Sequence, residues 1–256
     1  MNELARMTTE EAATAIAAAR LALLPVGSLE QHGPHLTLDT DTAVADAVAR
    51  RLATELGDDA VLCPTIGYGL SEHHLAFAGT LTLRPATYLA LIDDVLDSLA
   101  HHGLRRVLIV NGHGGNIDAL RLAARTARRD RRMLVASLMW AIIAADAAAE
   151  TAGSPAYGHA CEVETSVVLA VAPDRVRSER IGPPAARHSV DALTDPPRST
   201  VDEPVWLHEW SDDGALGDPR SATEEAGRRV VEVVVERALG FARRMAERPL
   251  PDEEAM

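Results

Sequence analysis

Short apolar runs alternate along the chain with longer segments in which apolar residues recur every three or four positions. The apolar runs each begin directly after a charged residue and have the length of buried strands; they cover residues 21–26, 60–64, 107–110 and 133–139. Segments 40–56 and 85–101 have the periodicity of amphipathic helices. This alternation predicts parallel βαβ units, with helices on both faces of a mainly parallel sheet, which is an α/β fold.

Other segments have helix-start signals, helical periodicity or alanine-rich composition, and we predict helices at residues 8–20, after Asn116, at 141–151 and at 222–247. Asn116 is expected to cap its helix. Residues 181–204 are rich in proline, serine and aspartate, which predicts a surface excursion, and the tail 249–256 is expected to fray. A single domain over residues 1–256 is the simplest organisation.

Three polar, glycine-containing loops follow predicted strands directly, at residues 27–41, 65–79 and 111–116. In open parallel sheets, ligands bind beyond the carboxyl ends of the strands. We therefore expect the three loops to converge at one edge of the sheet.

Two histidines and three carboxylates crowd the first loop, namely Glu30, His32, His35, Asp39 and Asp41. Carboxylate and imidazole together are ligands of hydrolytic metals such as zinc, manganese or iron. Residues two apart in an extended segment point the same way, so Glu30 and His32 can share one ion. Asp41, near a helix start, can bind one ion or bridge two. The alternative is a capping aspartate with loop histidines that face water.

The segment Asn111–Asn116 places His113 at the end of a strand, among glycines that let the backbone approach a ligand closely. The backbone amides of Gly114 and Gly115 are candidates to hold an anionic oxygen of the substrate. A phosphate-binding loop is excluded, because the glycine spacing fails at Ile117 and no Walker lysine follows. A plain strand-to-helix turn is the alternative.

A third cluster lies within residues 158–166, ahead of an apolar run. If this segment is helical, His159 and Glu162 lie on one face and Glu164 points elsewhere. The pair suits a general acid or base and a metal-held carboxylate, with helix capping as the alternative. Cys161 is expected to be a small buried residue rather than a nucleophile.

Candidates for substrate binding lie in the second loop and after the fourth predicted strand. Tyr68 and His74 occur in a block with paired histidines, and Trp140 directly follows residues 133–139. Surface histidines and a core tryptophan are the alternatives.

Composition narrows the class of protein. The chain has 256 residues and 47% hydrophobic residues, enough for a sizeable core. Aromatic residues make up only 3% and the net charge is -13, which argues against a nucleic-acid partner. The chain has only two cysteines, Cys63 and Cys161, so a disulfide scaffold is excluded by count, and a reducing, cytoplasmic setting is the simpler interpretation. No stretch has the apolar length of a membrane span or a secretory signal, so we expect no membrane partner.

Taken together, the polar blocks resemble the creatininase (creatinine amidohydrolase) family. The blocks follow one another in the family's order and are Gly27–Leu36 with Asp39–Asp41, Tyr68–Thr80, Asn111–Asn116 and His159–Ser166. The resemblance spans residues 21–173. It implies a three-layer α/β/α fold with a mainly parallel sheet, usually as a homohexamer, and one or two divalent ions per subunit.

The resemblance also implies roles for individual residues. The implied metal ligands are Glu30, His32, Asp41 and His113. Asp41 would bridge where two ions bind. His159 would be the proton-transfer residue, and Glu162 would be a catalytic carboxylate in the same site.

Gly115 departs from creatininase itself, which carries a glutamate ligand at this place. The departure weakens the case for creatinine as substrate and leaves the second metal position open, with Glu162 as a candidate to supply the missing carboxylate. Relatives with the glycine include a deformylase of flavin-type cofactor biosynthesis and a peptidase that trims a redox-cofactor precursor.

The expected activity is metal-dependent hydrolysis of a non-peptide amide C–N bond, cyclic amides included, by a metal-activated water. The substrate would be a small-molecule amide. A peptidase or deformylase of cofactor biosynthesis is the first alternative, and a non-catalytic metal-binding protein is the second.

Overall fold

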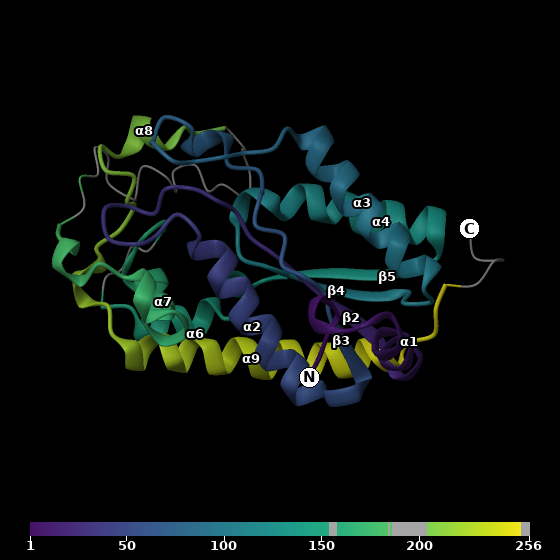
Figure 1. Ribbon diagram of the computed structural model, residues 1–256. Coiled ribbons are helices and arrows are strands. Elements are labelled where there is room, and N and C mark those ends of the chain that lie inside the picture. Colours follow the sequence, from purple (N-terminus) through teal and green to yellow (C-terminus); the bar gives the residue numbers. More distant parts are fainter. Residues whose placement is uncertain (154–157, 184, 186–203, 252–256) are drawn as a thin grey trace.

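The computed structural model describes residues 1–153, 158–183, 185 and 204–251. At its centre is a parallel sheet with the strand order β1-β3-β2-β4-β5 (Figure 1). Its strands are β1 (Asn2–Glu3), β2 (Leu21–Val26), β3 (Ala60–Leu62), β4 (Arg106–Asn111) and β5 (Leu134–Met139). Every pairing in the sheet is parallel, as between β2 and β4, where Leu24 lies opposite Ile109.

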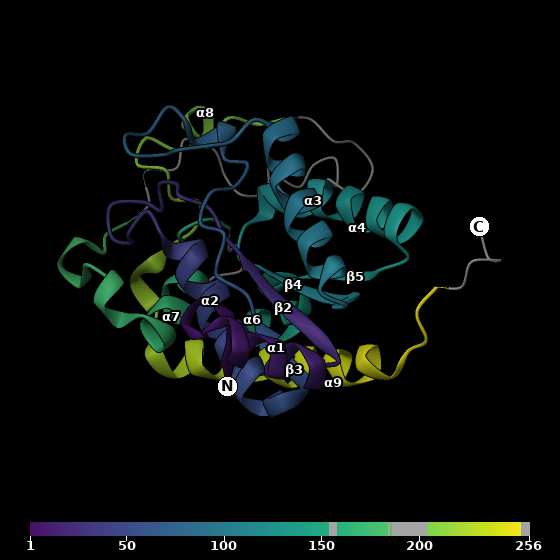
Figure 2. The same ribbon diagram turned by 45° about the vertical axis from the view of Figure 1, so that its right-hand side comes forward.

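Helices cover both faces of this sheet (Figures 1 and 2). One layer contains α3 (Pro85–His101) and α4 (Ile117–Arg131). The opposite layer contains α2 (Thr40–Leu56), α6 (Ala145–Thr151), α7 (Glu162–Val171) and α9 (Glu224–Glu247). The remaining α-helices are α1 (Thr9–Ala18), α5 (Trp140–Ile143) and α8 (Leu207–Trp210). The predicted α/β architecture is therefore confirmed.

Alternation along β2 explains why there are two cores. Leu21 and Leu23 pack with α2, α7 and α9, whereas Ala22 and Leu24 pack with α3 and α4. Successive side chains of a strand point to opposite faces, so a strand that is apolar at every position is stable only when both faces are covered. All six residues of β2 are buried.

The boundaries predicted from periodicity are confirmed for β2, α2 and α3. The strand predicted at 60–64 is shorter and ends at Leu62. The helix predicted at 141–151 is divided at Ala144 into α5 and α6, and the last helix begins at Glu224, where the Thr223 hydroxyl accepts a hydrogen bond from the Ala226 amide. Residues 184, 186–203 and 252–256, which include most of the expected excursion and tail, lie outside the described part of the chain.

Asn116 does not cap α4 through its side chain, contrary to expectation. Its Nδ2 donates to the carbonyl of Gly27 at 3.0 Å, and its Oδ1 accepts from the amide of Leu70 at 3.0 Å. One amide side chain thus joins the loops that follow β2, β3 and β4 at the carboxyl edge of the sheet.

Candidate metal centre and active site

The carboxyl edge gathers the side chains that the sequence marked as metal ligands. Glu30 and His32 come from the loop after β2, Asp41 from the first turn of α2, and His113 from the loop after β4. All four are buried, with at most 4% of each residue exposed. His113 Nδ1 lies 3.1 Å from Glu30 Oε2 and 3.0 Å from Asp41 Oδ2.

A glycine allows this convergence. A Cβ atom at Gly112 would lie 2.1 Å from the backbone oxygen of Asp41, so the first turn of α2 can approach the end of β4 only when residue 112 has no side chain. Gly112 therefore serves the close packing of two backbone segments, whereas the predicted close approach of this segment to a ligand stays a prediction.

Three groups of side chains offer ligand atoms that lie within 4.8 Å of one another, and they are Glu30–Asp41–His113, His32–Asp41–Glu164 and Glu30–His32–His159. Asp41 belongs to the first two groups. Its Oδ2 is buried, makes no hydrogen bond of good geometry with a described residue, and has the His113 imidazole 3.0 Å away as its partner. Buried carboxylates and imidazoles whose ligand atoms converge in this way fit one or two divalent ions.

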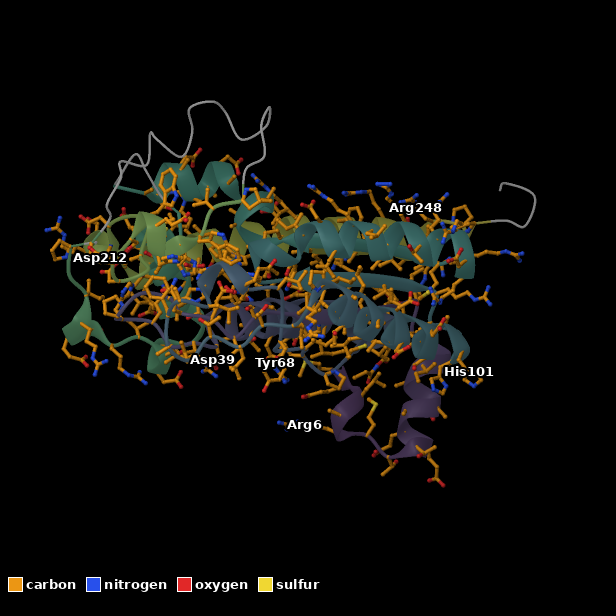
Figure 3. The ribbon with its side chains drawn as sticks, turned by 90° about the horizontal axis from the view of Figure 1, so that it is seen from above. Arg6, Asp39, Tyr68, His101, Asp212 and Arg248 are labelled. Carbon is orange, nitrogen blue, oxygen red and sulfur yellow. The ribbon has the colours of Figure 1, made fainter. Side chains whose placement is uncertain are left out.

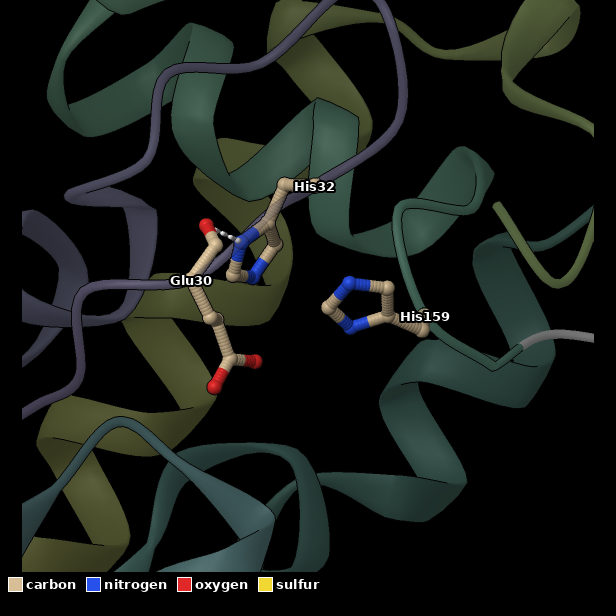
Figure 4. A group of neighbouring side chains, drawn as sticks. All are labelled: Glu30, His32 and His159. Atoms are coloured by element: carbon tan, nitrogen blue, oxygen red, sulfur yellow. Dashed lines mark hydrogen bonds between the residues drawn. The ribbon is translucent and has the colours of Figure 1, made fainter. Parts of the chain in front are cut away.

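The orientation of His32 suits ligation (Figure 4). Its Nδ1 donates a hydrogen bond to the backbone carbonyl of Glu30 at 3.1 Å, and its Nε2 lies 3.2 Å from Asp41 Oδ1. A hydrogen bond that holds the proton on Nδ1 leaves the Nε2 lone pair for a metal, which is the usual arrangement of ligating histidines.

Glu164 joins the cluster, and Glu162 does not, which corrects the prediction. The carboxylate of Glu162 accepts the backbone N–H of Gly153, at 3.0 and 2.9 Å from its two oxygens, away from the other ligands. Glu164 Oε1 instead lies 3.8 Å from His32 Nε2. The prediction failed because α7 begins only at Glu162: Ala160 adopts a left-handed conformation with φ of 52°, so His159 is not on the same helix.

Mutual attraction of opposite charges dominates the electrostatics of the cluster. Burial opposes ionisation of Glu30, but the attraction of His113 and His74 together outweighs it and lowers the pKa of Glu30 to about 2. Burial likewise opposes the charged form of His32, while Asp41 and Glu164 raise its pKa to about 10. The pKa of His113 is raised well above its usual range, against burial, by Glu30 and Asp41. The protons on these two imidazoles thus balance the negative charge of the carboxylates, as a bound cation would.

Glu164 and His159 differ from this pattern because burial prevails. Burial raises the pKa of Glu164 to about 7, although His32 pulls it down. Burial and the charge of His32 lower the pKa of His159 to about 3, so its imidazole is neutral. His159 Nε2 donates to the backbone carbonyl of Gln31 at 2.7 Å, and therefore Nδ1 carries the free lone pair.

Sequence reasoning missed a set of groups that hold the Glu30 carboxylate. Ser28 Oγ donates to Glu30 Oε2 at 2.9 Å and Ser71 Oγ donates to the same oxygen at 2.5 Å. His74 Nε2 lies 3.3 Å from Glu30 Oε1, while its Nδ1 accepts from Gln31 Nε2 at 2.8 Å. The signal was available for Ser28, which precedes Glu30 by two positions, but Ser71 becomes visible only when the loop after β3 is folded over the site.

A cavity of about 920 Å³ opens beside the cluster. Of the residues predicted to bind substrate, those that line it are His74, Gly114, Gly115 and Trp140. Trp140 is 3% exposed, and its indole Nε1 has no acceptor among the described residues. Tyr68 was also expected to bind substrate, but the structure places it elsewhere. The residue is 50% exposed on the outside of the molecule and does not line the cavity (Figure 3).

Gly115 has no room for a side chain in this fold. A Cβ atom there would lie 2.3 Å from the Leu70 carbonyl oxygen and 2.5 Å from His113 Nε2, which itself lies 2.9 Å from that oxygen. A ligand from position 115 would therefore collide with the support of His113. Among the described residues, Glu164 of α7 is the carboxylate from another segment that groups with His32 and Asp41.

The comparisons with known proteins agree with this site. A family model described as creatinine amidohydrolase matches residues 5–241. The chain belongs to the creatininase family. The mycofactocin precursor peptide peptidase of Mycobacterium ulcerans is 37% identical over 223 residues, which cover 84% of this chain and 81% of the relative. The creatinine amidohydrolase of Pseudomonas putida is 30% identical, over 84% of this chain and 85% of the relative.

A crystal structure of creatinine amidohydrolase superimposes on the creatininase-like chain with a TM-score of 0.78 and 28% identity, covering 96% of this chain and 98% of that one. Relatives in the family are metal-dependent hydrolases that act on amide bonds, and this chain is a hydrolase of the same family. Among the residues that the structure describes, no helix has both the length and the apolar composition needed to cross a bilayer.

Proposed function

We propose that the chain is a metal-dependent amide hydrolase whose substrate is a peptide. The observation that carries the hydrolase assignment is the pair of ligand groups that share Asp41 at the wall of an open cavity. The peptide assignment rests on similarity, because several relatives at 35–37% identity carry the name of a precursor peptide peptidase, above the 30% of the creatinine amidohydrolase.

Two sets of residues would hold the ions. Glu30, Asp41 and His113 would bind one ion, and His32, Asp41 and Glu164 a second, with Asp41 between them. When bound, a divalent ion makes a water acidic enough to attack near neutral pH and polarises the carbonyl of the scissile amide. The other steps fall to side chains and backbone groups of the cavity.

His159 is the candidate for proton transfer. Its ring lies against that of His32, with centroids 4.3 Å apart, and its Nε2–H is held by the Gln31 carbonyl. The free Nδ1 would accept the proton of the attacking water and deliver it to the leaving nitrogen. Burial and the neighbouring positive charge lower the pKa of His159 and keep its imidazole neutral, which is the state that a proton acceptor needs.

Groups around the cavity would orient the substrate. Gly114 and Gly115 line it, and their backbone amides would donate to the oxygen that becomes negative as the amide carbon turns tetrahedral. Trp140 offers an indole N–H without an acceptor among the described residues, which would fix a polar group of the substrate.

A small cyclic amide is the second candidate substrate. It is favoured by the match with creatinine amidohydrolase, which extends over nearly the whole of both structures. Gly115 tells against it, because the chain lacks room for the side chain that creatininase uses there.

A substrate panel separates these candidates. Protein reconstituted with zinc, manganese or iron would be tested on unmodified short peptides, on an N-formyl amide and on creatinine. Cleavage of peptides at the highest kcat/KM supports the proposal, while cleavage of creatinine alone would support the small cyclic amide. If full metal occupancy brings no hydrolysis of any amide, the chain is a non-catalytic metal-binding protein.

The same proposal extends to assembly and location. The metal would be zinc, manganese or iron, and the chain would work as a single-domain subunit of a homo-oligomer, a hexamer by resemblance to the family, in the cytoplasm. Elemental analysis of the purified protein and analytical ultracentrifugation would test the metal and the subunit number.

A further inference from the structure

The outer edge of β5 is free of any neighbouring strand in the described part of the chain. Leu134 donates its backbone N–H to the carbonyl of Arg105 on the β4 side, at 2.8 Å. Backbone groups of a parallel strand alternate in direction, so those of Val135, Ser137 and Met139 point away from β4. An edge of this kind can pair with an added strand.

Helices α4 and α9 flank this edge and turn it into a groove. A cavity of about 480 Å³ lies beside the second half of β5, and one of about 180 Å³ lies beside the first half. Phe241 of α9 lines both, so the two cavities adjoin along the strand. Leu138, Met139 and Ile142 add further apolar lining, and Ile142 is 61% exposed.

Arginines line this β5 groove although the protein carries a net charge of -13. They come from α4 and from α9 with its C-cap, and they are Arg121, Arg125, Arg128, Arg237, Arg244 and Arg248. Among the described residues, no aspartate or glutamate lines either cavity. Arg121 pairs with Asp118 and Arg237 with Asp146, whereas Arg125, Arg128 and Arg244 make no ion pair with any described residue.

The groove ends at the active-site cavity. Met139, the last residue of β5, lines both the groove and the cavity beside the metal ligands. Asn111 also lines the groove, and its side chain holds His113: its Oδ1 accepts from the His113 amide at 3.1 Å and its Nδ2 donates to the His113 carbonyl at 2.7 Å. A segment that follows β5 from Leu134 to Met139 therefore runs toward the candidate ligands.

We propose that the β5 groove docks an extended, acidic segment of the peptide substrate, added to the sheet as a further strand. The peptide backbone would pair with Val135, Ser137 and Met139, and its carboxylates would meet the unpaired arginines. This proposal rests on the proposed peptidase function, which it deepens. A second copy of the chain fits less well, because a two-fold pairing of β5 would bring like-charged arginine walls together.

Peptide binding is the direct test. Metal-loaded protein would be titrated with a fluorescently labelled peptide of alternating valine and glutamate, with a valine–lysine peptide as its matched control, and followed by fluorescence anisotropy. We expect the glutamate peptide to bind at least about tenfold more tightly than the lysine peptide. Its affinity should fall as the salt concentration is raised, because exposed charges are screened. Equal affinity of the two peptides would overturn the proposal.

Two variants locate the binding site. The double variant Arg125→Glu/Arg128→Glu reverses the charge that α4 presents to the groove and should lower the affinity for the glutamate peptide about tenfold or more. Ser137→Pro removes one outward N–H and leaves the hydrogen bonds to β4 in place. It should therefore lower the affinity for the peptide while the circular dichroism spectrum stays that of the wild type. Arg51→Glu, an exposed arginine of α2 outside both cavities, is the matched control and should bind as the wild type does.

The outcomes separate this proposal from the peptidase function. If short peptides are cleaved but the glutamate peptide binds no more tightly than the lysine peptide, the peptidase function stands and the docking role of the β5 groove is overturned. Binding that depends on Arg125 and Ser137 in a protein that cleaves no amide would support the groove and overturn the function. A dimer that Ser137→Pro dissociates would show that a second copy occupies the edge, which also overturns the proposal.

Discussion

Glu164 Oε1 lies 3.8 Å from His32 Nε2, so a carboxylate from α7 reaches the cluster formed by the loops after β2 and β4. The backbone N–H of Ala160 donates to the other oxygen of Glu164 at 2.6 Å, which fixes this carboxylate from its own side. The second ligand group thus depends on how the chain turns into α7, two residues beyond the carboxylate that the sequence favoured.

Replacing Glu164 by glutamine removes a charged ligand oxygen from the group with His32 and Asp41. We expect the affinity of the second ion to fall at least about tenfold, measured as metal content by elemental analysis after dialysis at graded metal concentrations. Glu162→Gln is the matched control and should keep its metal, while losing about 1 kcal/mol of unfolding free energy through the weakened bonds to Gly153. Metal loss only in Glu162→Gln would reverse the assignment.

A methyl group at Gly115 would collide with the Leu70 carbonyl and the His113 ring. Gly115→Ala should therefore displace His113 and lower the metal content. Gly114→Ala should leave the metal content unchanged, since no atom of the described residues lies within 4 Å of a Cβ there. Both variants would be compared by metal analysis and by circular dichroism. Equal metal content in folded Gly115→Ala and Gly114→Ala would contradict the crowding argument.

Metal binding should release protons. His32, with its pKa raised to about 10, and His113, with its pKa raised well above the usual range, are both protonated at pH 7, and ligands must be neutral. Because these protons compete with the metal, the affinity for the metal rises with pH and falls on acidification. Isothermal titration calorimetry in buffers of different ionisation enthalpy would count the protons, and a binding enthalpy independent of buffer would show that the imidazoles are already neutral.

Replacing His159 by alanine should lower kcat by a factor of about 100 to 10,000, because a positioned proton carrier is lost. The metal content should stay that of the wild type, which separates proton transfer from ligation in the group with Glu30 and His32. His101→Ala, an exposed histidine at the end of α3, is the control and should retain full activity. Loss of metal in His159→Ala would make this residue a ligand instead.

Much of the fold follows from local patterns in the sequence. Helical periodicity places α3 to the residue and α2 to within one residue of its start. A run that is apolar at every position identifies β2 as a strand buried on both faces. The convergence of Glu30, Asp41 and His113 follows from parallel strands, whose carboxyl ends meet at one edge.

The remaining site residues depend on geometry that periodicity does not encode. The structure brings Glu164 to the ligand cluster, where the sequence predicted Glu162. The reason is that the left-handed conformation of Ala160 sets where α7 begins, and each residue along a helix points about 100° away from the one before it. Tyr68 was expected at the substrate and is exposed, since its loop presents His73 and His74 to the cavity instead. Those placements come from tertiary packing.

The single amide of Asn116 has a consequence for motion. Because it fastens Gly27 and Leu70 at once, the loops after β2 and β3 are latched to the start of α4. Ser71 and His74 of the loop after β3 also hold Glu30 of the loop after β2, so the catalytic rim should open and close as one cooperative unit rather than loop by loop. Entry of a metal ion or a long substrate would then be governed by one shared fluctuation of the rim.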